Sequence, residues 1–389
     1  MMQALEKLDV QKPCGREETS APRASLDKSR RIEFLDVLRG LAALLVFVQH
    51  SMETRSGSFL LWTTKYVSIG EMGVVVFFIV SGFVIPVSLE KYNSLSRFWL
   101  GRLLRLWPVY LASLAIAVVF DNLNIMGMHQ FRDAFHFHPG LVVLGNATML
   151  EQFLGIPVAI SAYWTLSLEL VFYILCSLLF VFGVLRRTQT WLWVSVAILL
   201  LSQVALAGAF HQSLPAGRVG LIVTALFGTL LYRQQSDRNL PQTLLTVLPV
   251  LFSVFAVTFW LRSHFYTRPS ILSADHSLRA TTLCLVMTWI SAYLIFLAGF
   301  ALRARQFPRL LIWLGQISYP LYLFHSMVLA LMPTTLPWPA YLLGTLSISL
   351  LIAYLIHVLI EKPVERFQRK ALSRKPVPAP ARVLAMPAA

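Results

Sequence analysis

The feature of this sequence that most limits its fold is a series of apolar runs of about 20 residues along nearly the whole chain. One such run, folded as a helix, crosses a hydrocarbon core of ~30 Å. Of the 389 residues 57% are hydrophobic and only 13% are charged, about half the charged fraction of a soluble protein. We therefore expect an all-α fold, a polytopic integral membrane helix bundle with about ten transmembrane helices.

The expected spans follow from the positions of these apolar runs. A further apolar run at 140–156 contains Asn146, Glu151 and Gly155 and is followed by Pro157, so we interpret it as an interfacial or re-entrant piece. The spans that we expect are 34–53, 67–89, 98–120, 163–185, 189–209, 215–232, 241–261, 280–301, 310–332 and 341–360.

The positions of Lys and Arg orient the bundle. Most of the 33 Lys and Arg residues lie at the two ends of the chain and in every second connection, which by the positive-inside rule predicts that both termini are cytoplasmic. The organisation that we expect is a disordered cytoplasmic tail (1–31), a membrane domain (32–363) and a second disordered cytoplasmic tail (364–389), in the inner (plasma) membrane. Topology explains the net charge of +15, so no nucleic-acid partner is expected. The three scattered cysteines indicate no metal site.

Ionisable residues share one face of the first span. Arg39 and His50 are 11 positions apart, which places them about 20° apart around the helix and about 16 Å apart along it. Asp36 lies three residues before Arg39, the spacing of a helical ion pair. Ionisable side chains at bilayer depth are costly, so these residues are functional candidates. The alternative is that Arg39 anchors the helix end and that His50 is an interfacial histidine.

The second and third spans add polar candidates whose alternatives are structural. Ser81 precedes Gly82, a pair that favours close helix packing over contact with a ligand. Arg102 and Arg105 lie one turn apart at the cytoplasmic edge of the third span. Positive-inside topology alone would explain them, although paired arginines also suit phosphate groups.

The fourth span begins with Trp164 and carries Glu169 several residues below the outer face. A lone carboxylate at that depth needs a partner, and we expect His50, at comparable depth, to be this partner. Trp164 can equally belong to an interfacial aromatic belt.

In the ninth span one stripe of polar residues runs outward, with offsets of 0, 4 and 7. Its last residue should reach nearly the depth of His50. Such a stripe more often serves helix packing than catalysis. Its members are Ser318, Tyr322 and His325.

Six motifs in chain order resemble those of the membrane acyltransferase-3 family, which O-acylates bacterial surface polysaccharides, lipopolysaccharide and related glycans. The resemblance covers residues 32–363, and Gly101 stands where many members have a basic residue. The motifs are Arg39 with His50, Phe77 to Phe83, Arg102 with Arg105 and Pro108, Trp164 to Glu169, Gly315 to His325, and the closing Glu361-Lys362-Pro363.

The resemblance implies a cytoplasmic acyl-CoA donor, with acetyl-CoA expected, and a saccharide acceptor reached from the outer side. No cofactor is expected to stay bound. Our hypothesis places the donor phosphates on Arg39, Arg102 and Arg105, with His50 as general base. Glu169 would orient the imidazole, and an acyl-histidine intermediate is an open alternative. Supporting or substrate-binding roles are expected for Asp36, Ser81, Trp164, Ser318, Tyr322 and His325.

Two other functions are compatible with a polar path through such a bundle. A transporter or flippase for a lipid-linked or acylated sugar would line its pathway with buried charges. A structural or signalling scaffold would have no need of an aligned arginine and histidine. The sequence does not name the sugar, the hydroxyl, the length of the acyl chain or the oligomeric state.

Overall fold

In the computed structural model of the protein, residues 21–125, 129–210, 216–235, 237–265 and 281–373 are described, and all regular structure in them is helical. The helices are α1 (Ala21–Arg55), α2 (Gly57–Lys65), α3 (Ile69–Tyr92), α4 (Leu95–Asn122), α5 (His129–Phe137), α6 (Pro139–Ala147), α7 (Tyr163–Val181), α8 (Thr188–Phe210), α9 (Ala216–Gln234), α10 (Leu240–Phe265), α11 (Thr282–Ala301), α12 (Arg309–Gln316), α13 (Ser318–Leu331), α14 (Trp338–Ile356) and α15 (Lys362–Ser373), with a π-helical turn at His357–Glu361 between the last two.

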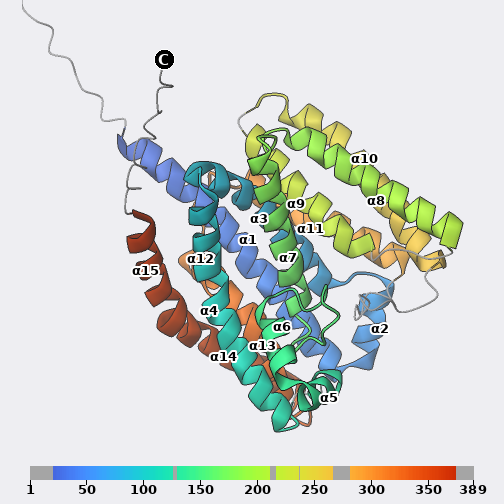
Figure 1. The fold of residues 1–389 in the computed structure, drawn as a ribbon, viewed down its shortest axis with the longest axis vertical. Helices are drawn as coiled ribbons and strands as arrows, with labels where there is room; N and C mark the ends of the chain where they lie inside the picture. The colour runs from blue at the N-terminus through green and yellow to red at the C-terminus, as the bar shows by residue number, and fades with distance from the viewer. Residues whose placement is uncertain (1–20, 126–128, 211–215, 236, 266–280, 374–389) are drawn as a thin grey trace, which may run out of the picture.

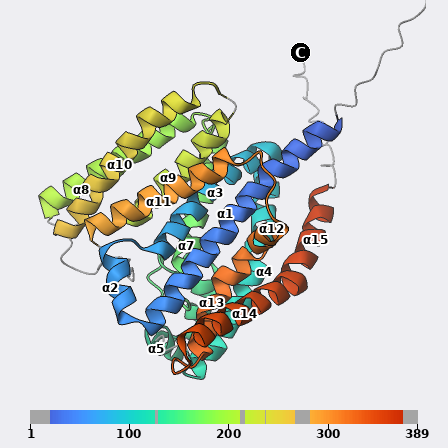
Figure 2. The same ribbon diagram turned by 180° about the vertical axis from the view of Figure 1, so that it is seen from behind.

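The predicted polytopic helix bundle is confirmed. Within the described residues nine helices are long and apolar enough to cross a membrane, and α13 is a shorter apolar helix. These ten segments coincide with the ten expected spans. Figures 1 and 2 show α1, α3 and α7 in the middle of the molecule, α8 to α11 on one side, and α4 with α12 to α15 on the other. The first residues of α1 and the last residues of α15 lie at the same end of the bundle.

Small residues allow the central helices to approach each other closely. A Cβ atom at Gly73 of α3 would collide with the carbonyl oxygen of Ala42 in α1, and one at Gly82 with that of Ala225 in α9. The Thr229 hydroxyl also donates a hydrogen bond of 2.7 Å to the carbonyl oxygen of Gly82. Gly82 therefore serves helix packing, as the Ser-Gly pair predicts, because lipid-embedded helices associate through close packing and hydrogen bonds.

The expected span 310–332 is broken into α12 and α13 where it crosses α1. A Cβ atom at Gly315 would overlap the carbonyl oxygen of Asp36, and one at Gly40 would lie 2.8 Å from the amide nitrogen of Gly315. The Ser318 hydroxyl donates to the carbonyl oxygen of Gly315 across the break, at 2.7 Å. The break thus fixes the height of α13 relative to α1.

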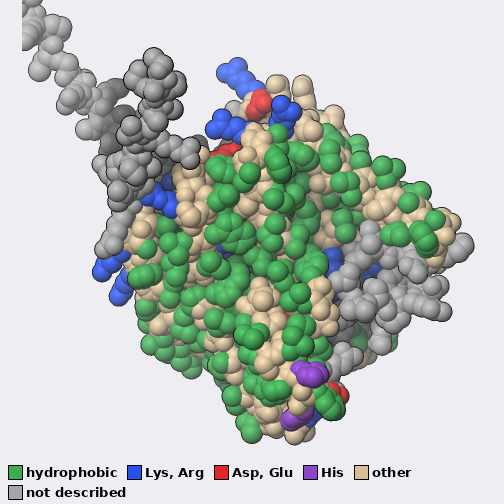
Figure 3. Space-filling model, in the orientation of Figure 1, with side chains coloured by type: hydrophobic (Ala, Val, Ile, Leu, Met, Phe, Trp, Pro, Cys, Tyr) green, Lys and Arg blue, Asp and Glu red, His purple; other side chains and the backbone are tan. Residues whose placement is uncertain are grey.

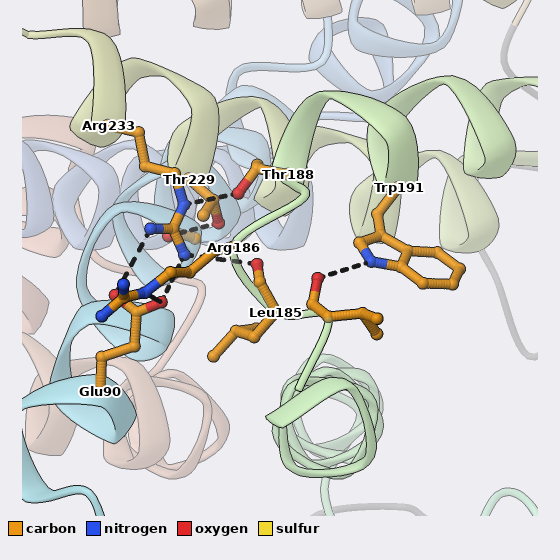
Figure 4. Close-up of polar contacts among 9 residues, drawn as sticks. Glu90, Leu185, Arg186, Thr188, Trp191, Thr229 and Arg233 are labelled. Atoms are coloured by element: carbon orange, nitrogen blue, oxygen red, sulfur yellow. Dashed lines mark hydrogen bonds and ion pairs between the residues drawn. The ribbon is translucent and has the colours of Figure 1, made fainter. Parts of the chain in front are cut away.

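Apolar side chains form a broad surface across the face in Figure 3, with most Lys and Arg side chains along its upper and left edges. One basic cluster joins the ends of three helices (Figure 4). Arg233 of α9 contacts Glu90 of α3 at 2.7 Å and donates to the Thr188 hydroxyl of α8 at 2.6 Å. Arg186 lies 3.9 Å from the same carboxylate. Some basic connection residues therefore hold the bundle together.

The predicted disordered tails fall mostly outside the described residues, but where they are described the chain is helical. α1 begins at Ala21, and α15 continues to Ser373. A Cβ atom at Gly101 of α4 would lie 3.3 Å from Gln368 Nε2 and 3.7 Å from Leu372 Cδ1. The absence of a side chain at Gly101 therefore leaves room for Gln368 and Leu372 of α15 to pack on α4.

The region 140–156 forms the helix α6 followed by turns, and is not among the candidate spans. Asn146 is buried and closes this loop, because its side chain donates to the carbonyl oxygens of Val142 and Pro157 and accepts from the amide of Ala159. The loop leads directly into the first turn of α7.

We predict that Gly82→Ala destabilises the bundle, because the added methyl group displaces the α9 backbone. The cost of such overpacking is about 1–3 kcal/mol. Thermal unfolding followed by size-exclusion chromatography should show a lower midpoint. Gly208→Ala is the matched control, since a Cβ atom at Gly208 in α8 meets no atom within 4 Å. An equal midpoint for the two variants would contradict close α3–α9 packing.

We predict that the stability of the folded protein depends on pH through Glu151, which lies in the loop before α7. It accepts a hydrogen bond from the Ser167 hydroxyl at 3.0 Å, and its other oxygen is buried with no partner among the described residues. Burial raises the pKa of Glu151 to about 7. The carboxyl group thus favours the folded state while it is neutral, and this contribution is lost as the pH rises through the folded pKa. Glu151→Gln should therefore melt increasingly above wild type as the pH rises from about 4.5 to about 7, and the difference should stay constant at higher pH.

Candidate active site

The first part of the site is a cavity of about 320 Å³, here called the arginine cavity. Arg39 of α1 lines it together with Arg102 and Arg105 of α4, and Asp36 and Glu169 add carboxylates from α1 and α7. Apolar and aromatic side chains of α3, α4, α7 and α13 form most of the remaining wall. The cavity thus combines three cations with an apolar lining, a combination suited to an anionic group attached to a less polar chain.

Two of these arginines are held differently. Arg102 donates to the Ser88 hydroxyl at 2.9 Å, and its guanidinium lies over the rings of Phe98 and Tyr173, at 5.6 and 5.8 Å. Arg105 is exposed and forms no hydrogen bond or ion pair within the described residues. Arg105 is therefore the more available of the two for an incoming anion.

Glu169 belongs to this cavity and does not partner His50, contrary to the expectation from sequence. Its carboxylate accepts hydrogen bonds from the Tyr173 hydroxyl at 2.6 Å and the Ser81 hydroxyl at 3.1 Å. Glu169 lies six residues into α7, about 9 Å along the helix, which brings it to the arginines. Ser81 accordingly has a role in the site beside that of its neighbour Gly82 in packing.

The second part of the site is a polar cavity of about 430 Å³, here called the histidine cavity. His50 lines it, together with Glu53 and Glu71. The Arg218 guanidinium also lies there, 5.5 Å from the centre of the Trp164 ring. Carboxylates, hydroxyl groups and an aromatic face in one cavity suit a polyhydroxylated ligand.

His50 pairs with a second histidine. Its Nδ1 lies 2.8 Å from His325 Nε2, and the two rings stack with an interplanar angle of 14°. His325 Nδ1 in turn lies 2.8 Å from the carbonyl oxygen of Tyr322 and 3.2 Å from that of Leu321. His325 is buried, with 1% of its surface exposed.

These partners define the tautomers of the pair. A carbonyl oxygen only accepts, so Nδ1 of His325 carries the hydrogen and, in a neutral ring, its Nε2 is an acceptor. His50 must then donate from Nδ1, which leaves the lone pair on Nε2 of His50. That nitrogen lies on the ring edge remote from His325. The pair therefore presents one basic nitrogen of a histidine that lines the histidine cavity.

The two cavities share Val74 and Tyr322 as lining residues. The Tyr322 hydroxyl lies 2.8 Å from that of Thr165 in the first turn of α7, and its ring contacts Phe77 edge-on. The predicted stripe on α13 runs from the arginine cavity to the histidine pair. Ser318 lines the arginine cavity, Tyr322 lines both cavities, and His325 contacts His50.

Several residues of the site were not singled out from the sequence. Tyr173 lies four residues after Glu169, a spacing that could have identified it as a partner on the same helix face. Arg218 and Glu71 carry a weaker signal, because each is an isolated charge near the end of an apolar helix. The pairing of His50 with His325 has no local signal, since 275 positions separate the two residues.

The acyltransferase domain family matches residues 32–360 of this chain. The acyltransferase MdmB of Streptomyces mycarofaciens is 30% identical over 37% of the chain and 38% of that protein. Nodulation protein 10 of Rhizobium leguminosarum is 23% identical over 78% and 84% of the two chains, and a putative O-acetyltransferase of Staphylococcus aureus is 23% identical over 90% and 60%. The chain thus spans less than two thirds of the first and third of these relatives.

No solved structure matches the chain. The family match covers most of the membrane region, including both cavities and the two histidines. It favours group transfer over the transporter and scaffold alternatives. The chain is a polytopic membrane protein, and it belongs to the acyltransferase-3 family.

Proposed function

We propose that the protein transfers an acyl group, with acetyl as the expected group, from cytoplasmic acyl-CoA to a hydroxyl group of a saccharide. The observation that carries this proposal is the contact of His50 Nδ1 with His325 Nε2, from which we infer a basic Nε2 on His50. His50 lines the histidine cavity, which shares two lining residues with the arginine cavity. The alternative, a flippase for an acylated sugar, gives no role to a basic nitrogen held in this way.

The arginine cavity supports the donor side. Arg39 and Arg105 are suited to the diphosphate of the nucleotide, and the mostly apolar wall is suited to the pantetheine arm. The rise from Arg39 to His50 is about 16 Å, a distance on the order of the length of that arm. Tyr322, shared by both cavities, lies where the thioester would pass. Glu169 would then set the charge of this cavity and support its shape through Tyr173 and Ser81.

In the proposed reaction His50 Nε2 removes the proton from the acceptor hydroxyl while the hydroxyl oxygen attacks the thioester carbonyl carbon. The new C–O bond forms as the C–S bond breaks, and the coenzyme leaves as a thiol after taking the proton from the imidazolium ring. His325 holds the first ring in the required tautomer, the role of an orienting group in a catalytic triad. The alternative route, acylation of Nε2 itself, uses the same lone pair.

The histidine cavity supports a saccharide acceptor. Trp164 offers an aromatic face, and Glu53 and Glu71 offer acceptors for sugar hydroxyl groups. Two of the relatives are named a nodulation protein and a putative O-acetyltransferase, and O-acyl transfer to a glycan is consistent with these names. Surface polysaccharide, lipopolysaccharide and related glycans are the acceptor classes that we propose.

We place the arginine end of the path in the cytoplasm, with both termini inside, in a bacterial inner membrane. The basic connection residues support this orientation, because Arg186 and Arg233 lie at the helix ends that the positive-inside rule assigns to the cytoplasm. Acyl-CoA is made inside the cell, so the donor would meet the arginines first. The acceptor would approach His50 from the opposite side.

We predict that His50→Gln lowers acyl transfer by about 10²–10⁴-fold, the usual contribution of a general base. The assay measures release of free thiol and labelling of glycan when purified protein in liposomes receives labelled acetyl-CoA. His264→Gln is the matched control, since His264 stacks on Trp260 in α10 and is exposed. A folded His50→Gln protein with wild-type transfer would exclude the base role.

We predict that His325→Ala lowers kcat about tenfold or more and leaves the KM for acyl-CoA unchanged, because only the acceptor of the His50 Nδ1 hydrogen is removed. His325→Gln should recover part of the rate, since the amide oxygen can accept that hydrogen bond. Equal rates for the Ala and Gln variants would contradict this hydrogen-bonding role of His325.

The two routes predict different products when donor is supplied without acceptor. General-base catalysis predicts no acyl group on the peptide that contains His50, because the attacking hydroxyl group is missing. Mass spectrometry of rapidly quenched protein measures this directly. A mass increase on that peptide, absent from His50→Gln, would establish the acyl-histidine route instead.

A further inference from the structure

A third cavity, of about 590 Å³, adjoins the arginine cavity and is here called the vestibule. It lies between α1, α4, the α12–α13 break, the π-helical turn and α15. Five residues line both cavities, so the vestibule is continuous with the site already described. These shared residues are Asp36, Arg39, Arg105, Ser318 and Tyr319.

The vestibule has an excess of positive charge. Its acidic residues are each beside a basic residue or a histidine: Asp36 lies 3.9 Å from Arg39, Glu365 lies 3.6 Å from Arg369, and Glu361 lies 2.6 Å from His357 Nδ1. Three further basic side chains line it and form no hydrogen bond or ion pair among the residues that the structure describes. They are Arg105, Lys362 and Arg366.

The π-helical turn explains how α15 forms a wall of the vestibule. The backbone N–H of Lys362 bonds to the carbonyl oxygen of His357, five residues back, where an α-helix would use four. Pro363 follows, and its ring would clash with the carbonyl of Leu359 in a regular α-helix. The wider turn relieves this clash, and the bond between His357 and Glu361 spans it. The helix then continues as α15, which presents Arg366 to the vestibule.

We propose that the vestibule is the binding site for the phosphomonoester at the nucleotide end of the acyl-CoA donor, and that Arg366 is its principal contact. This inference rests on the proposed function, because it assigns another part of the same donor. The thioester, the pantetheine arm, the diphosphate and the phosphorylated ribose follow one another along the donor. The protein offers a matching series in the same order. The histidine cavity is followed by the arginine cavity, then by Arg39 and Arg105, which line both neighbouring cavities, and then by the vestibule.

Arg366 is suited to this contact because it is exposed, lines the vestibule and forms no ion pair with a carboxylate among the described residues. A guanidinium binds a phosphomonoester with two parallel hydrogen bonds. The match to the acyltransferase domain ends at residue 360, so Arg366 lies beyond it. The wall that α15 contributes to the vestibule thus lies outside the family match.

A lipid headgroup carries the same phosphate chemistry and is the competing source. α15 is basic, and Phe367 is 61% exposed beside Arg366, as in helices that lie at a membrane surface. Arg366 also lines a cavity that is continuous with the arginine cavity, and this continuity favours the donor.

The test compares the binding of CoA and of 3′-dephospho-CoA, which lacks only the phosphomonoester, to the purified full chain in a neutral detergent. The variants are Arg366→Gln and Arg366→Glu, with Arg309→Gln as the matched control. Arg309 is exposed at the start of α12 and does not line the vestibule. We expect Arg366→Gln to bind CoA about tenfold more weakly and to bind dephospho-CoA with unchanged affinity. Arg366→Glu should weaken CoA binding further, and Arg309→Gln should match wild type.

Unchanged CoA binding in Arg366→Gln, or an equal loss for CoA and dephospho-CoA, would overturn the assignment. A parallel measurement adds phosphatidylglycerol and follows thermal stabilisation. Stabilisation that depends on Arg366, together with unaltered CoA binding, would assign the arginine to lipid and reject the donor. Failure of the proposed function has a different result, since wild type itself would then bind no CoA, and the inference would fall with it.

Discussion

The site depends on the fixed geometry of one helix. Arg39 and His50 share a face of α1 because 11 residues correspond closely to three helical turns. That face would be useless if lipid covered it. Instead, α3 and the α12–α13 break pack against α1 so closely that glycine is required at Gly73, Gly40 and Gly315. Close packing therefore both buries the polar face and positions the walls of the cavities along it.

The bilayer explains why the polar groups of the site occur as connected networks. Within hydrocarbon, an unsatisfied polar group costs several kcal/mol, so each candidate must bond to another part of the protein. Glu169 is satisfied by Tyr173 and Ser81, Arg102 by Ser88 and two aromatic rings, and His325 by backbone carbonyls. These bonds also fix orientation, which the proposed general-base catalysis requires. The same interactions thus stabilise the fold and hold the candidate residues in place.

The sequence predicted those parts of the structure that depend on local periodicity. The apolar segments follow from helix length, and among the described residues nine candidate spans and the shorter helix α13 are found. The shared face of Arg39 and His50 is predicted from helix pitch, and the two residues line two cavities with common lining residues. The partner of His50 could not be predicted in this way. Depth alone made Glu169 the candidate, but the break after Gly315 sets the height of α13 and brings His325 to His50. Contacts between helices are decided by packing, which a single sequence does not encode locally.

The C-terminal segment is a second case in which contacts between helices could not be predicted from local sequence. Residues 371–389 are rich in Pro and Ala, and disorder is predicted for 364–389. Residues 364–373 are nevertheless helical, and Gln368 and Leu372 lie beside Gly101. The departure from the family pattern at Gly101 thus has a structural consequence. A basic side chain there would occupy the space that α15 uses, whereas glycine admits a helix that brings its own arginines. In this chain, α15 places Arg366 and Arg369 in the vestibule together with Arg105 of α4.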